Sequence, residues 1–206
     1  METMDSTEID RIATTKNERR QWAADNDWRY RDEAPELLDR WEVKPFTEPS
    51  DDRIAFGVVA GKAHGVEFTV FDYHHHSRKN GYQVDTAWVV PLGVEVPRFQ
   101  IFKDGEVNFQ DVKAGTSPAP ILDRYLRYDY RIALTDSEIA RWVLTPQVLE
   151  IMVEHRIHNW ALSGSDLVCT RHPILKRIKP KKILKVIGGL SALRFALSHV
   201  TDDKGR

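Results

Sequence analysis

The chain has 206 residues, a formal net charge of −1 at pH 7 and 30% charged residues. A charge so close to neutral excludes a global field that would attract DNA or anionic lipid to the whole molecule. A chain of this length buries about 70% of the surface of its unfolded form, so it needs neither disulfides nor a metal to fold. These values indicate an ordinary globular protein of one large domain or two small lobes.

Three features of the sequence bear on its cellular compartment. The single cysteine, Cys169, cannot form an internal disulfide, which favours a reducing compartment. Residues 1–22 contain no apolar run of the kind that a secretory signal needs. The most apolar stretch, residues 183–200, is interrupted by Lys185 and Arg194 and is too short and polar to span a bilayer. We therefore expect a cytoplasmic protein.

The first 50 residues predict an N-terminal helical segment and a linker. Residues 1–25 are polar with sparse apolar positions, which is typical of a solvent-facing helix that docks near Trp22. Pro35 suits the first position of a short helix over residues 35–41. Prolines and polar residues over 44–52 disrupt both helical and strand periodicity, which indicates a linker.

The alternation of apolar and polar residues changes to a period of two near residue 53. This period predicts antiparallel strands, and glycines at 61–65 and at Asn80-Gly81 predict the turns between the first three. We expect a meander, with strands over residues 53–60, 66–76, 82–90 and 96–102.

The C-terminal half predicts a loop over 114–120, a strand over 128–134, a helix pair capped by Thr135 and Thr145, and a hairpin over 157–170. An amphipathic helix over 179–200 closes the chain. The predicted fold is therefore α+β: an antiparallel β-sheet meander with an N-terminal helix, a central helix pair and a long C-terminal helix. We expect residues 51–200 to form the core domain and residues 201–206 a disordered tail.

Three consecutive histidines in "FDYHHHSRKNGYQ", residues 71–83, raise the question of a metal site. If Asn80-Gly81 is a two-residue turn, His76 pairs with Asp85 and His75 points to the opposite face. One face then holds two imidazoles and two carboxylates, a donor set that suits a divalent metal ion. The alternative is a polar sheet face turned to water. The candidate metal ligands are Asp72, His74, His76 and Asp85.

A second candidate site is the only charge-dense stretch of the sequence, residues 171–185. Such a basic patch suits anionic lipid headgroups or nucleic acid, although the absence of aromatic residues counts against single-stranded nucleic acid. The alternative is a solvated flank of a helix, even though cations at a helix start oppose the helix dipole. The candidate residues are Arg171, Lys176, Arg177, Lys179, Lys181, Lys182 and Lys185.

No motif assembles a catalytic group. Cys169 and His172 lie three positions apart, so a strand would place them on opposite faces, and we expect Cys169 in the core. The glycine-rich residues 57–65 lack the spacing and the hydroxyl residue of a phosphate-binding loop.

The chain resembles a family of uncharacterised bacterial proteins, mainly actinobacterial, that carry W-x-Y, F-x-x-F-D-Y and L-T-P segments. The matching stretches are "RRQWAADNDWRY", "GVEFTVFDY" and "RIALTDSEIARWVLTP", and the similarity covers about residues 19–200. The family has no assigned activity, so the resemblance implies no catalytic residues. Some similar proteins carry a membrane segment near the N-terminus. Threonine and serine are usual in that family at the positions of His74 to His76, so a metal there would be particular to this chain.

These observations predict a non-enzymatic binding or interaction module without a cofactor. We expect a protein partner, or a peripheral contact with an anionic membrane through the basic C-terminal segment, and the sequence gives no strong signal for nucleic acid. The alternative is a metal-binding protein or metal-dependent hydrolase that uses the histidine and aspartate face of the hairpin over residues 66–90.

Overall fold

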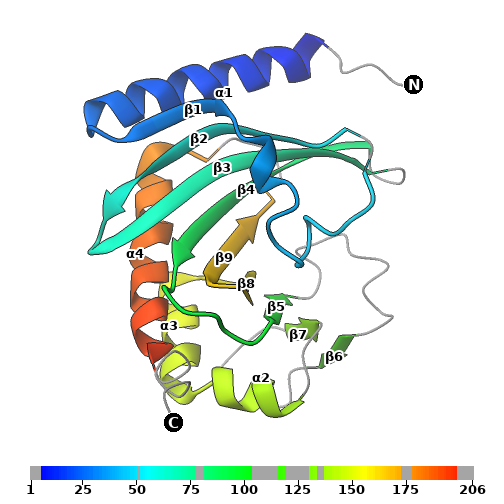
Figure 1. The fold of residues 1–206 in the computed structure, drawn as a ribbon, viewed down its shortest axis with the longest axis vertical. Coiled ribbons are helices and arrows are strands. Elements are labelled where there is room, and N and C mark those ends of the chain that lie inside the picture. Colours follow the sequence, from blue (N-terminus) through cyan, green and yellow to red (C-terminus); the bar gives the residue numbers. More distant parts are fainter. Residues whose placement is uncertain are drawn as a thin grey trace.

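The strands of the protein join in a single antiparallel sheet, as the computed structural model shows (Figure 1). The structure describes residues 6–50, 52–77, 81–103, 116–118, 130–133, 137–172 and 178–198. Within these ranges the sheet has nine strands, in the order β1-β2-β3-β4-β9-β8-β5-β7-β6. The predicted α+β fold, with an N-terminal helix, a helix pair and a long C-terminal helix, is confirmed.

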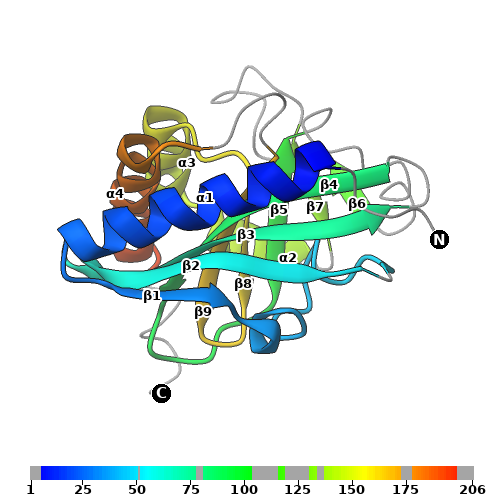
Figure 2. The ribbon, with the colours of Figure 1, turned by 90° about the horizontal axis from the view of Figure 1, so that it is seen from above.

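The N-terminal segment is part of the same sheet. Helix α1 (Ser6–Asp25) lies across the sheet on the side that also carries α4 (Pro180–Ala196), as Figure 2 shows. Its C-terminal half is the end that packs, since Trp22 and Ala23 are buried there. Strand β1 (Arg29–Glu33) follows as an edge strand on β2 (Ile54–Ala63). The predicted helix over residues 35–41 is a single 3-10 turn, η1 (Pro35–Leu37).

The hairpin of β3 (Val66–Ser77) and β4 (Gly81–Pro91) has a register that differs from the predicted one. Ser77 pairs with Gly81, so three residues separate the last paired positions instead of two. Asp85 therefore faces Tyr73, and the predicted pairing of Asp85 with His76 is wrong. Side chains alternate between the two faces along a strand, so a register shift by an odd number of positions moves each β4 side chain to the other face relative to β3. Asp85 therefore shares a face with Tyr73 and His75 rather than with Asp72 and His74.

The C-terminal hairpin, β8 (Trp160–Ser163) and β9 (Asp166–Arg171), lies between β4 and β5 (Phe99–Lys103). The meander thus ends at β4, and the strand predicted over residues 96–102 does not pair with β4. Beyond β5 follow β7 (Tyr130–Ala133) and β6 (Thr116–Pro118), the second of which lies in a predicted loop. Helices α2 (Ser137–Val143) and α3 (Pro146–His155) complete the fold.

Two hydrophobic clusters cover the two faces of the central strands. One cluster packs Trp88, Trp160 and Leu190 beneath α1, α3 and α4. The other packs Trp41 and Phe46, from the segment after η1, against Phe71 and Tyr73 of β3. Because both faces are covered, polar side chains at the middle of β3 and β4 are buried on either side.

Some predictions fall on residues outside the described ranges: the tail over 201–206, the cap Thr135 and the basic residues Lys176 and Arg177. The predicted cap of α3 is confirmed, because the Thr145 hydroxyl accepts a hydrogen bond of 3.3 Å from the Val148 amide. No helix within the described ranges is long and apolar enough to cross a membrane.

Candidate functional site

Asp72 of β3 is buried on the face beneath α1. Its Oδ1 accepts hydrogen bonds from Arg19 of α1 at 2.5 Å and from the Thr86 hydroxyl of β4 at 2.7 Å. Arg19 also donates to the Gly57 carbonyl of β2 at 2.9 Å. The Asp72 carboxylate thus already binds the Arg19 guanidinium and the Thr86 hydroxyl, and the bond to Arg19 holds α1 on the sheet.

His74 lies on the same face and is fully buried. Its ring stacks on Tyr82 with 5.1 Å between the ring centroids, and among the described residues neither ring nitrogen has a hydrogen-bond partner. Burial lowers the pKa of His74 to about 4 because a charged imidazole would lose its hydration there. His74 is therefore neutral at pH 7.

Asp85 of β4 lies on the opposite face, between two other histidines. Its Oδ2 is 3.2 Å from Nε2 of His75, and its Oδ1 is 3.2 Å from Nδ1 of His172, which follows β9. Burial disfavours the charge of Asp85, but the hydrogen bonds from His172 and His75 outweigh this effect and lower its pKa. The same bond to Asp85 raises the pKa of His172.

The predicted metal site is therefore divided between the two faces of the sheet. Asp72 and His74 face α1, whereas Asp85 contacts His75 and His172 on the other side. Across the ranges that the structure describes, no three His, Cys, Asp or Glu side chains are arranged to hold a metal ion. The alternative, that these four polar residues are turned to water, is also wrong for three of them. Asp72 is 3% exposed, His74 0% and Asp85 8%, whereas His76 is half-buried.

His172 is the residue of this cluster that the sequence did not indicate. It lies 87 positions from Asp85 and reaches it because β9 pairs with β4, with Arg171 opposite Thr86. No short-range spacing signals this pairing. Cys169 of β9 is buried in the opposite cluster, as expected, and burial raises its pKa to about 12.

The start of α4 carries the described part of the predicted basic patch. The first turn of α4 contains no acidic residue. Four lysine side chains are exposed here, and none has an ion pair or side-chain hydrogen bond in the described part of the chain. We call them the α4 lysine cluster: Lys179, Lys181, Lys182 and Lys185. Arg171, by contrast, is half-buried on β9.

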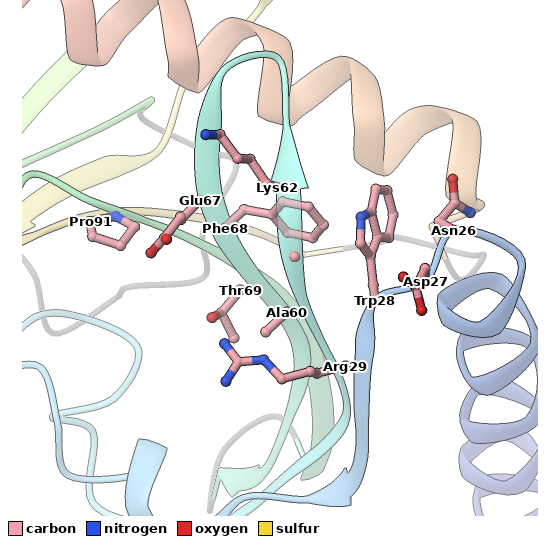
Figure 3. Close-up of a pocket in the computed structure, with 11 residues that line it drawn as sticks. Asn26, Asp27, Trp28, Arg29, Ala60, Lys62, Glu67, Phe68, Thr69 and Pro91 are labelled. Carbon is pink, nitrogen blue, oxygen red and sulfur yellow. The ribbon is translucent and has the colours of Figure 1, made fainter.

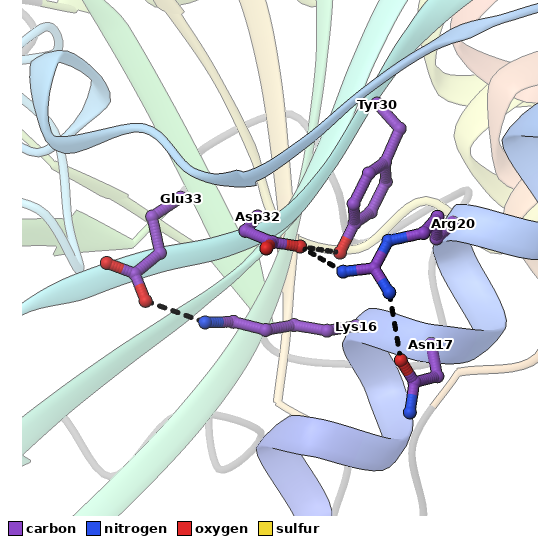
Figure 4. A network of polar contacts seen from close by, with 6 residues as sticks. All are labelled: Lys16, Asn17, Arg20, Tyr30, Asp32 and Glu33. Atoms are coloured by element: carbon purple, nitrogen blue, oxygen red, sulfur yellow. Dashed lines mark hydrogen bonds and ion pairs between the residues drawn. The ribbon is translucent and has the colours of Figure 1, made fainter.

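Strand β1 is attached to α1 by an exposed polar network, shown in Figure 4. Lys16 pairs with Glu33 at 2.6 Å, and Arg20 pairs with Asp32 at 2.7 Å. The Tyr30 hydroxyl donates to the same Asp32 oxygen at 2.8 Å, and this bond is the main reason why the pKa of Asp32 is lowered. Exposed pairs of this kind contribute little individually, so the network orients β1 more than it stabilises the protein.

An open hollow of about 410 Å³ lies at the other end of β1, where β2 and β3 turn (Figure 3). Its floor includes Ala60, Thr69 and Pro91. The charged residues that line it are Asp27, Arg29, Lys62 and Glu67. We call this site the β1–β4 hollow.

Comparison with known proteins identifies the fold and no family. No family model matches the chain, and no curated protein matches it in sequence. Among solved structures, the crystal structure of the mycobacterial trehalose monomycolate transport factor A, TtfA, is similar, with a TM-score of 0.67. The likeness covers 89% of this chain and 94% of that chain at 13% sequence identity. At this identity the likeness establishes that the chain shares the fold of TtfA.

Proposed function

We propose that this chain is a non-enzymatic binding module that works in the cytoplasm and docks on an anionic membrane surface through the α4 lysine cluster. The observation that carries this proposal is the exposure of four lysines at one helix start without an acidic partner in the described residues. Lysines at this end of a helix oppose the helix dipole by a few tenths of a kcal/mol each. A bound anionic surface would offset this unfavourable contribution.

The expected affinity is modest. A lysine near an anionic membrane contributes about 1 kcal/mol, so four lysines contribute about 4 kcal/mol, which corresponds to a dissociation constant of about 1 mM. Binding of this kind weakens as salt screens the charges. The module would therefore bind reversibly, and a second contact would be needed for stable attachment.

The fold supports a role of this type. The similar solved structure is named as a transport factor for trehalose monomycolate. A transport factor acts by binding, so a fold shared with one is consistent with a binding module. We propose only the docking role for this chain. Trehalose monomycolate is not proposed as its ligand.

Co-sedimentation with vesicles tests the proposal. We expect the protein to sediment with vesicles of phosphatidylcholine and phosphatidylserine at low salt, and not with phosphatidylcholine alone. The variant K179E/K181E/K182E should remain in the supernatant.

A control variant, R31E/R98E/R141E, carries the same change of charge on exposed side chains of β1, of the segment before β5 and of α2. It should sediment like the wild type. Retained binding of the α4 variant, or an equal loss in both variants, would contradict a specific role of the cluster. If the wild-type protein does not bind these vesicles, docking on an anionic membrane is excluded. A protein partner then remains as the interpretation of a binding module.

A further inference from the structure

The β1–β4 hollow exists because the segment after η1 covers only one end of its sheet face. That segment packs on Phe71 and Tyr73, farther along β3. At the uncovered end, the register places Arg29 opposite Ala60 and Ala60 opposite Thr69, so these three residues form one row across the strands. Lys62 and Glu67 are opposite each other in a neighbouring row on the same face.

The charged side chains in the hollow differ from those on the rest of β1. Arg31, Asp32 and Glu33 each form an ion pair, with Glu36, Arg20 and Lys16 respectively. Arg29, Lys62 and Glu67 form no ion pair or side-chain hydrogen bond in the described ranges, although Lys62 and Glu67 are directly opposite in register. Two cations, Arg29 and Lys62, and two carboxylates, Glu67 and Asp27, therefore line the same hollow, and none of the four has a side-chain partner in the described ranges.

We propose that the β1–β4 hollow binds a small zwitterionic ligand that carries a phosphate or carboxylate and an ammonium group. The anionic group lies between Arg29 and Lys62, where guanidinium and ammonium donors can share it, and the Thr69 hydroxyl can add a hydrogen bond. The ammonium group lies at Glu67. This site is separate from the α4 lysine cluster and goes beyond the proposed membrane docking.

The size of the hollow is consistent with such a ligand. Strands β1 and β3 are two strand spacings apart, about 10 Å, so the backbones that carry Arg29 and Glu67 lie on either side of β2. A volume of about 410 Å³ is within the range of small-molecule sites. Because the hollow is open to solvent, we expect weak binding that depends on both charged groups of the ligand.

NMR titration with O-phosphoethanolamine at low salt tests the site, with inorganic phosphate and ethanolamine as separate probes. We expect shifts of the amides of Lys62, Glu67 and Thr69, and tighter binding of O-phosphoethanolamine than of either fragment. The variants R29Q and E67Q should each weaken its binding by about tenfold, the usual effect of losing one hydrogen bond to a charged group.

The variant R31Q is the matched control, because Arg31 has the same type of side chain on the same strand but is already paired with Glu36. It should bind like the wild type. Equal affinity for O-phosphoethanolamine and phosphate, an equal effect of R31Q and R29Q, or no shift at the three amides would overturn the proposal.

Two further measurements complete the test. The first distinguishes a lipid headgroup from a free metabolite, and the second distinguishes the β1–β4 hollow from the α4 lysine cluster. Vesicles of phosphatidylcholine with phosphatidylethanolamine should retain the protein if the ligand is a lipid headgroup, whereas binding of only the soluble probe indicates a free metabolite. The variant K179E/K181E/K182E should bind O-phosphoethanolamine unchanged, so failure of membrane docking and failure of this site give different results.

Discussion

Arg19 of α1 and Asp72 of β3 form an ion pair inside the protein, with 2.5 Å between Nη2 and Oδ1. The two side chains are 4% and 5% exposed. Arg19 also reaches the Gly57 carbonyl at a bulge of β2, where Gly57 has a φ of +60° and a Cβ would lie 3.2 Å from Cδ of Arg19. The position of α1 on the sheet therefore depends on a buried charge pair as well as on apolar packing.

Substitution of Arg19 by methionine should lower the free energy of unfolding by about 3–5 kcal/mol, because it leaves the Asp72 carboxylate buried without its cation. Urea denaturation measures this loss. The control is R20M, which removes the exposed pair of Arg20 with Asp32 and should cost less than about 1 kcal/mol. If R19M costs no more than R20M, the buried pair does not hold α1 in place.

Because the pKa of His74 is lowered, we expect the free energy of unfolding to decrease as the pH falls from about 6.5 to about 4. The unfolded chain takes up a proton near pH 6.5, whereas the buried imidazole takes it up only near its pKa of about 4. The unfolded state therefore binds more protons in this range, and the free energy of unfolding falls by about 3 kcal/mol across it.

The variant His74→Phe keeps a ring against Tyr82 and removes the two unpartnered nitrogens. It should be more stable than the wild type at pH 5 and should show a smaller decrease between pH 6.5 and pH 4. The measurement is urea denaturation at a series of pH values. An unchanged slope in this variant would mean that other groups cause the loss in acid.

The secondary structure near these residues could be predicted from the sequence, whereas their environment could not. Alternation located β3 and β4, and Thr145 with Pro146 located the start of α3. The register could not be predicted, because the connection lies between Ser77 and Gly81 rather than at Asn80-Gly81. The pairing is therefore shifted by three positions, and Asp85 pairs with Tyr73 instead of His76.

The insertion of β8 and β9 between β4 and β5 is the second feature that the sequence did not reveal. The pairing joins residues about 80 positions apart, for which local periodicity carries no information. It places His172 beside Asp85. A strand pattern rich in polar residues normally indicates exposure, and here it marks buried polar groups. Asp72 and Asp85 have hydrogen-bond partners, whereas the His74 ring has none among the described residues.

His172 should titrate above its usual range because Asp85 accepts its hydrogen bond. Its contribution to stability is present below pH 6.5 and is lost as the pH rises through the higher pKa of the folded state, the opposite sign to His74. NMR titration of the imidazole should show the raised pKa in the wild type and a decrease in D85N. The control D72N, on the other face of the sheet, should leave the titration of His172 unchanged.

Gly61 of β2 should not tolerate a side chain, because the Trp28 ring lies directly against its backbone. A Cβ at residue 61 would be 2.4 Å from Cδ1 of Trp28, so G61A must displace a ring that also packs edge-to-face on Trp22 and Phe68. We expect G61A to lower the free energy of unfolding by about 1–3 kcal/mol and to change the tryptophan fluorescence. In the control G188A, the nearest atom to the new Cβ is 3.5 Å away and the site is helical, so alanine should be neutral or stabilising. Equal stability of G61A and G188A would show that Trp28 can move without cost, and the wall that it gives to the β1–β4 hollow would then be adaptable rather than fixed.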